Sequence, residues 1–260
     1  MTQLVVVGGG KMGEALLGGL LAGGWAAPDA VAVVEPDESR RAMLARRFPG
    51  IVAVAEPVVA DGAVVAVKPQ VVPQVCAQLG ELGIGRILSI AAGVRLASME
   101  AEVPATTAVV RAMPNTPSLV GMGAAAIAGG TAATEADLVW AEQILGAVGT
   151  VVRVTEDQIN AVTGLSGSGP AYVFLIAEAL IDAGVLVGLP RDVAADLAIQ
   201  TLRGSAELLG AGTPPAEARA NVTSPGGTTA AGLRALEAAG VRAAIIDAVV
   251  AAATRAGEMG

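Results

Sequence analysis

Residues 221–229 read NVTSPGGTT and combine four hydroxyl side chains with a Pro-Gly-Gly turn, directly before an apolar stretch of helical composition. Backbone N–H groups at the start of a helix can bind a carboxylate or a phosphate without any cationic side chain. A helix cap needs one hydroxyl oxygen, so capping leaves the others unexplained. Two interpretations stay open here: a plain helix start, or a small-acid receptor to which Ser224 and Thr229 add hydrogen bonds.

A second candidate site lies near the amino end of the chain. Its residues are Gly8, Gly9, Gly10, Lys11, Met12 and Gly13, which match G-x-G-x-x-G. An apolar, β-branched run precedes them, and a stretch of helical composition follows. In this setting the glycines allow a tight turn, a close approach of a pyrophosphate and close helix–strand packing. The pattern predicts dinucleotide binding, with a merely structural glycine turn as the alternative.

Glu35 follows the next apolar run and lies 22 residues after Gly13. A carboxylate in this position bonds the adenosine ribose 2′-hydroxyl and repels a 2′-phosphate. Arg40 and Arg41 are close enough in sequence to attract that phosphate instead. The alternative interpretation is a solvated glutamate at a strand end, without a ligand role. The coenzyme is therefore NADPH or NADH, and the sequence leaves the choice between them open.

Lys68 and Pro69 come after a fourth apolar run, at the sheet edge where open α/β folds bind ligands. Lys11 and Lys68 are the only lysines of the chain, and both fall at predicted strand ends. A ligand role and a solvated surface role are about equally supported for them. The loop RAMPNTP at 111–117 also follows a strand, and its two prolines make it rigid.

Eight short apolar runs predict a largely parallel sheet covered by helices on both faces. They lie at 3–7, 31–34, 51–54, 63–67, 86–92, 108–113, 124–129 and 150–154. Helices are expected between them at 11–22, 37–47, 70–82 and 134–147. The later segments 171–187, 191–210, 228–239 and 241–258 look helical, and Ser168 and Pro170 suit the start of the first of these. We predict an α/β protein with a Rossmann-type domain at 1–155 and an all-helical domain at 156–260.

The overall composition excludes several classes of function. The chain has 260 residues, a formal net charge of −8 and no histidine. An acidic protein is a poor partner for nucleic acid, and without histidine neither Ser-His-Asp hydrolysis nor a His-ligated metal site is available. The single cysteine, Cys76, cannot form a disulfide within the chain and suits a reducing compartment.

The stretch 171–190 is long and apolar enough to raise the question of a membrane span. It carries Glu178 and Asp182, and a central acidic residue costs roughly 2.5–3.5 kcal/mol on insertion scales. The amino terminus lacks the basic start and cleavage pattern of a signal peptide. We therefore expect a cytoplasmic protein without membrane association, whose apolar helices form an oligomer interface.

Five motifs in order resemble those of pyrroline-5-carboxylate reductase. They are GGGKMGEA at 8–15, AVKP at 66–69, MPNTP at 113–117, LSGSGPAY at 165–172 and NVTSPGGTT at 221–229. The similarity spans nearly the whole chain; the first motif is generic, and the last two are specific to the family. The resemblance implies a homodimer, with further association of dimers left open, that uses NAD(P)H to reduce 1-pyrroline-5-carboxylate to L-proline in the last step of proline biosynthesis.

The resemblance also implies which residues contact each molecule. For the coenzyme they are the 8–13 loop with Ala66, Lys68, Pro69, Met113, Pro114 and Asn115; for the substrate they are Ser224, Gly226, Gly227, Thr228 and Thr229. In this family the substrate lies between the nicotinamide and the 224–229 loop, which is partly supplied across the dimer. Backbone amides of 227–229 receive its carboxylate, Ser224 supports the pocket, and the Thr229 hydroxyl bonds the ring nitrogen.

The missing histidine is compatible with this reaction, because an imine arrives protonated and its iminium form is already an electrophile. Glu35 departs from the family, many members of which have a small polar or basic residue there; 53–55 is also unusually apolar. A β-hydroxyacid dehydrogenase would need a catalytic lysine in the second half, and no lysine follows Lys68. A non-catalytic dinucleotide sensor would not need the polar loop at 221–229.

Overall fold

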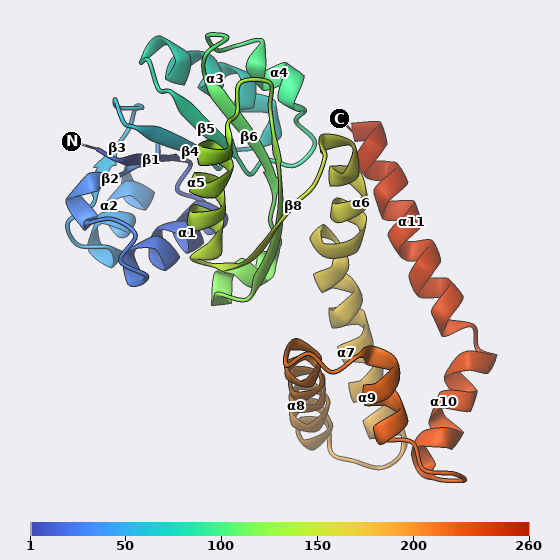
Figure 1. Cartoon of the computed structure of the whole chain (residues 1–260). Coiled ribbons are helices and arrows are strands. Elements are labelled where there is room, and N and C mark those ends of the chain that lie inside the picture. Colours follow the sequence, from blue (N-terminus) through green and yellow to red (C-terminus); the bar gives the residue numbers. More distant parts are fainter. Residues whose placement is uncertain (1, 260) are drawn as a thin grey trace. The chain divides into compact units, whose positions relative to one another are not determined.

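Eight strands form one sheet in the computed structural model, which describes residues 2–259 (Figure 1). The strands are β1 (Leu4–Val7), β2 (Val31–Val34), β3 (Val52–Val54), β4 (Gly62–Val65), β5 (Arg86–Ser89), β6 (Ala108–Met113), β7 (Gly123–Gly129) and β8 (Gly149–Arg153). Their order across the sheet is β3-β2-β1-β4-β5-β6-β7-β8. The order reverses between β1 and β4, and in such sheets this crevice binds the ligand. All eight predicted strands are therefore confirmed.

The last two strands run against the other six. β1 to β6 pair in parallel, β6 pairs antiparallel with β7, and β7 pairs in parallel with β8. A parallel connection needs a crossover of a dozen or more residues. The segment 114–122 between β6 and β7 is shorter and holds one 3-10 turn, η3 (Thr116–Val120), so the chain doubles back. The α/β prediction is confirmed, with this reversed pair as its exception.

Helices cover both faces of the sheet, as the apolar strands require. They are α1 (Lys11–Ala22), α2 (Glu38–Arg47), α3 (Val72–Glu81), α4 (Leu96–Glu100) and α5 (Glu135–Gly146). Alternation along β1 divides the core: Val5 and Val7 pack in one cluster with α3 and α4, whereas Leu4 and Val6 pack in the other with α1, α2 and α5. Burial on both faces explains the unbroken apolar runs of the sequence.

The remaining helices follow β8 in the chain and vary in length. They are α6 (Ile159–Val162), α7 (Gly169–Leu186), α8 (Arg191–Gly210), α9 (Pro215–Asn221), α10 (Thr228–Ala238) and α11 (Val241–Met259). Contacts divide the chain into two compact units, Met1–Ser168 with Ala251–Gly260, and Gly169–Val250. The short helix α9 was not among the predicted helices. Prolines usually indicate a break in a sequence, whereas Pro215 here occupies the start of the helix.

Helix α7 does not begin at a cap, contrary to the expectation from Ser168 and Pro170. A π-helical turn at Thr163–Gly167 joins α6 to α7, and the Ser168 amide donates a 2.8 Å bond to the Thr163 carbonyl. The combined helix, Glu156–Leu186, is long and apolar enough to cross a membrane by length and composition. It carries the exposed acidic residues Glu178 and Asp182, and Asp182 pairs with Arg191 at 3.1 Å.

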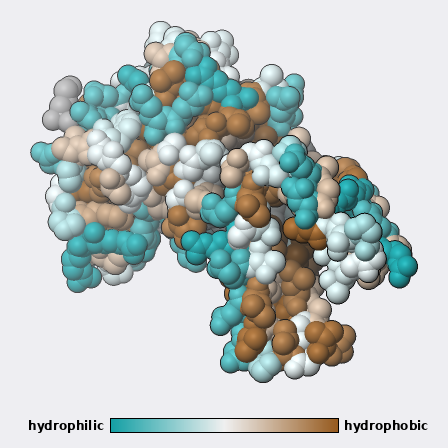
Figure 2. All heavy atoms as spheres, turned by 60° about the horizontal axis from the view of Figure 1, so that its bottom comes forward, coloured by the Kyte–Doolittle hydropathy of each residue, from teal (hydrophilic) through white to brown (hydrophobic). Residues whose placement is uncertain are grey.

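Apolar side chains lie on the surface of the unit formed by Gly169–Val250 (Figure 2). Large exposed ones include Phe174, Leu175, Leu186, Leu208 and Ile246. Among its described residues, only Ala194 and Ala198 are buried hydrophobics. A soluble chain rarely leaves a surface of this kind uncovered, so it indicates an interface.

Candidate coenzyme and substrate sites

The 8–13 loop has the backbone of a phosphate cradle. Gly8 has a φ of 110°, and a Cβ there would lie 2.5 Å from the Ala66 carbonyl oxygen. A Cβ at Gly13 would lie 2.0 Å from the Gly8 carbonyl oxygen, so neither position tolerates a side chain. A Cβ at Gly10 would meet nothing within 4 Å, and Gly10 directly precedes the first turn of α1. Open space over the start of a helix fits a pyrophosphate.

A pocket of about 330 Å³ opens at the carboxyl edge of the sheet, on the β4–β6 side of the crevice. It is lined by Met12, Ala66, Val67, Pro69, Ile90, Ala91, Ala92, Met113, Pro114, Asn115, Thr116 and Gly167. Its lining includes six of the residues predicted to bind the coenzyme and is mostly apolar, as suits a nicotinamide ring. Lys68 does not line it: this exposed residue precedes the 3-10 turn Pro69–Val71.

Sequence reasoning missed the other half of this lining. Ile90, Ala91 and Ala92 directly follow β5. In open α/β sheets ligands bind at the carboxyl ends of the strands, so the position of these residues after a predicted strand was a signal that they could line the site. Gly167 lies in the π-helical turn, and a Cβ there would lie 2.5 Å from the Met113 Cε atom. A π turn often marks a functional site, but an i→i+5 bond leaves no readable pattern in a sequence.

Glu35 lies at the end of β2, against the glycine loop. Its Oε2 atom would be 3.0 Å from a Cβ built at Gly9, and its Oε1 accepts a 3.0 Å bond from the Asp37 amide. The Asp37 pKa is lowered by its hydrogen bond from the Ser39 hydroxyl, so the Asp37 carboxylate stays ionised beside Glu35. Glu35 is thus held beside the glycine loop at the carboxyl end of the second strand.

The 224–229 segment forms a tight turn into α10. The Gly227 amide donates a 3.1 Å bond to the Ser224 carbonyl, and Gly226 between them has a φ of 70°. A Cβ at Gly227 would lie 2.4 Å from the Ser224 hydroxyl oxygen, so a side chain there would displace that hydroxyl. The turn therefore brings the Ser224 side chain over the first residues of the helix.

None of the hydroxyls in this segment caps α10. Its N-cap residue is Gly227, without a side-chain cap bond. The Thr223 hydroxyl instead donates to the Arg219 carbonyl at 2.6 Å. Within the described residues, the amides of Thr228 and Thr229 have no acceptor. Two adjacent N–H groups at a positive helix end form a receptor for one carboxylate.

Comparison with known proteins agrees with this geometry. Residues 156–259 match the family model for pyrroline-5-carboxylate reductase dimerisation, and 3–93 match that for coenzyme F420-dependent NADP oxidoreductase. Pyrroline-5-carboxylate reductase of Synechocystis sp. is 46% identical, with 99% of this chain and 98% of that protein covered. The chain belongs to the pyrroline-5-carboxylate reductase family.

Solved structures of the family superpose over the whole chain. The Coxiella burnetii pyrroline-5-carboxylate reductase matches with a TM-score of 0.93 and 35% identity, covering 100% of this chain and 98% of that one. The Plasmodium falciparum pyrroline carboxylate reductase, solved with NADP bound, matches with a TM-score of 0.82 and 30% identity over 100% and 98%. Membership of the pyrroline-5-carboxylate reductase family makes this chain an oxidoreductase with a Rossmann-type coenzyme domain, and its dimerisation domain makes it a homo-oligomer.

Proposed function

We propose that this protein reduces 1-pyrroline-5-carboxylate to L-proline with NAD(P)H, the last step of proline biosynthesis. The observation that carries the proposal is the pair of Thr228 and Thr229 amides, left without acceptors at the start of an uncapped helix. Together with the glycine cradle it provides one site for a dinucleotide and one for a small carboxylic acid. The protein is accordingly an NAD(P)H-dependent oxidoreductase acting on a C=N bond.

The coenzyme would be held by residues of the Rossmann-type unit. The amides at the start of α1, with Gly8, Gly9 and Gly10 before them, would bind the pyrophosphate. Glu35 would bond the adenosine ribose, and the apolar pocket around Met113 would take the nicotinamide. The chemistry that the bound coenzyme supplies is hydride donation. Lys11 and Lys68, both exposed, would add positive potential near the phosphates.

The substrate would be held by the segment 224–229. The Gly227 amide is committed to its own turn, so the amides of Thr228 and Thr229 would receive the carboxylate. The Thr229 hydroxyl would bond the ring nitrogen, and Ser224, fixed above Gly227 by the turn, would complete the polar wall. Because the iminium is already electrophilic, orientation and charge stabilisation are sufficient, and no histidine is needed.

We further propose that residues 156–260 serve as the dimerisation and substrate-binding domain of a cytoplasmic homodimer. The exposed apolar side chains of α7, α8 and α11 support such an interface. The acidic residues Glu178 and Asp182 on α7 disfavour contact of this helix with lipid. The partner would be a second copy of this chain, and the ligand would be a small molecule and not a nucleic acid.

The test is a spectrophotometric assay of coenzyme oxidation on adding 1-pyrroline-5-carboxylate, with proline measured as the product. Other cyclic imines, with and without a carboxylate, serve as controls. Oxidation that requires the carboxylate would support the proposal. Coenzyme binding without any imine-dependent oxidation would overturn it and leave a dinucleotide-binding protein.

A further inference from the structure

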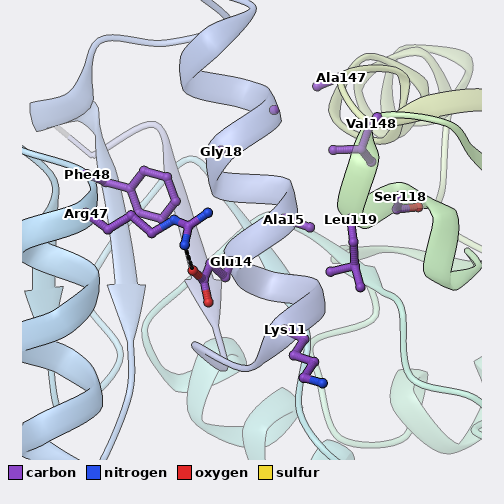
Figure 3. A pocket seen from close by; sticks show the side chains of 12 residues that line it. Lys11, Glu14, Ala15, Gly18, Arg47, Phe48, Ser118, Leu119, Ala147 and Val148 are labelled. Carbon is purple, nitrogen blue, oxygen red and sulfur yellow. Dashed lines mark ion pairs between the residues drawn. The ribbon is translucent and has the colours of Figure 1, made fainter. Parts of the chain in front are cut away.

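Glu14, in the first turn of α1, lies between two arginines of α2. Its Oε2 accepts a hydrogen bond from Arg40 Nη2. Its Oε1 lies 3.0 Å from Arg47 Nη1 (Figure 3). The Glu14 side chain is 16% exposed, Arg40 is 31% exposed and Arg47 is 64% exposed. Because shielding strengthens an ion pair, the contact with Arg40 is the stronger of the two.

The Arg40 guanidinium has a second partner in the coenzyme loop. Its Nε donates a 2.8 Å bond to the Gly9 carbonyl oxygen. Gly9 is also the residue against which Glu35 packs, with Oε2 3.0 Å from the position of a Gly9 Cβ. Arg40 and Glu35 therefore approach the same glycine, next to the position of the ribose 2′-group.

The neighbouring arginine, Arg41, is hydrogen-bonded to main-chain carbonyl groups. Arg41 Nη1 donates to the carbonyl oxygens of Glu35 and Pro36 at 2.8 and 2.9 Å. Arg47 lies further along α2, with its guanidinium carbon 5.7 Å from the centre of the Phe48 ring, and lines a groove beside α1 (Figure 3). Of these arginines, Arg40 is therefore the one whose ion pair with Glu14 determines whether a 2′-substituent meets a positive charge.

We propose that Glu14 is a specificity-determining residue for the coenzyme: it holds Arg40 on the Gly9 carbonyl, neutralises it, and so withholds it from a 2′-phosphate. The inference rests on the proposed use of NAD(P)H. With Arg40 withheld, the 2′-position faces the carboxylate of Glu35, which accepts a hydroxyl and repels a phosphate. For Arg40 to bind the phosphate, it would have to give up a charge-assisted bond to Glu14.

The proposal predicts a mutant cycle in coenzyme binding. NADH and NADPH are titrated without substrate, by the fluorescence of the reduced nicotinamide, into the wild type, Glu14→Gln, Arg40→Gln and the double variant. Glu14→Gln should shift the Kd ratio toward NADPH by roughly 3–10-fold, because an uncompensated guanidinium then lies beside the phosphate. In the Arg40→Gln background the same substitution should leave the ratio unchanged. Arg47→Gln is the matched control and should move the ratio less than about twofold, as expected of an exposed pair.

Glu14 also affects the binding of the pyrophosphate, which both coenzymes share. This effect is the same for NADH and NADPH, so it cancels in the ratio of their Kd values. An unchanged ratio in Glu14→Gln would overturn the proposal, and so would an equal shift in the presence and absence of Arg40. Circular dichroism checks folding, and Glu14→Ala replaces the glutamine variant if that variant is unfolded. A wild type that binds coenzyme but reduces no imine would overturn the proposed function and leave the cycle valid; one that binds neither coenzyme would overturn both.

Discussion

Asn115 and Ser166 are joined by a hydrogen bond of 3.0 Å from the side-chain Nδ2 of Asn115 to the carbonyl oxygen of Ser166. The Oδ1 atom of the same side chain accepts a 2.8 Å bond from the Ala124 amide. One amide group therefore connects the loop after β6 with β7 and with the π-helical turn. Since Gly167 in that turn lines the pocket proposed for the nicotinamide, Asn115 positions a wall of this pocket through contacts with protein.

Replacing Asn115 should loosen this wall. Asn115→Ala leaves the Ala124 amide and the Ser166 carbonyl without their partner. Both groups are partly buried, so each loss should cost less than the roughly 1–3 kcal/mol of a fully buried unpaired group. We expect a lower urea midpoint and a higher KM for the coenzyme. Asn115→Asp keeps the acceptor for Ala124 and loses the donor to Ser166, so it should fall between alanine and the wild type. Equal stability of all three proteins would contradict the bridging role.

Glu35 should make NADH an effective coenzyme. With Glu35 at the ribose position, a 2′-phosphate meets a like charge, so we expect NADH oxidation at a rate comparable to or better than that of NADPH. Glu35→Gln removes the repulsion and should raise kcat/KM for NADPH relative to NADH. Steady-state kinetics with both coenzymes measure this change. A strong NADPH preference that Glu35→Gln leaves unaltered would show that Glu35 does not face the ribose.

Thr229 should matter more than Thr228. Thr229→Ala removes one hydrogen bond to the reacting C=N group, worth about 1.5–3 kcal/mol, or roughly 10–100-fold in kcat/KM. Thr228→Ala should cost much less, because the amide of residue 228 and not its hydroxyl binds the carboxylate. Direct titration should show nearly unchanged coenzyme affinity in both variants. Equal and small losses would mean that the 224–229 segment only starts a helix.

The apolar helices should make the protein an obligate homodimer. Light scattering and analytical ultracentrifugation at micromolar concentration should detect no active monomer. Leu175 lies on the exposed surface of α7. Leu175→Glu should weaken association, because the substitution places a charge in the interface. Val59→Glu is the matched control: Val59 is similarly exposed but lies in the Rossmann-type unit. Full activity in a monomeric variant would refute the dimer as the active form.

Cys76 should be an unreactive thiol that destabilises the fold at alkaline pH. It is buried on α3, and desolvation raises its pKa to about 11 from its usual value near 9.0. A raised pKa means that the stabilising contribution is complete below pH 9 and is lost as the pH rises toward 11. Cys76→Ala should therefore flatten the fall in Tm between these values, relative to the wild type. Rapid labelling by a thiol reagent at pH 8 in the native protein would contradict the burial.

Much of the fold is readable in the sequence because its determinants are local. Apolar runs of four to seven residues contain strands that are covered on both faces. The spacing of Gly8, Gly10 and Gly13 specifies a turn that side chains would block. The NVTSPGGTT stretch likewise encodes its own conformation, since Pro225 and Gly226 suit a tight turn before a helix. These features need no knowledge of distant contacts, so the Rossmann-type sheet and the helical second half could be predicted from the residues alone, and both candidate sites could be proposed from them.

Other features depend on which distant residues meet, and they become visible in the folded chain alone. The direction of β7 follows from the path of a short loop across the sheet edge, and the role of Asn115 follows from a bond to a residue 51 positions away. Glu14 and Arg40, 26 positions apart, face each other because α1 and α2 pack side by side on one face of the sheet. A charge has no preferred partner in a sequence; its partner is set by the packing of the helices that carry the two side chains.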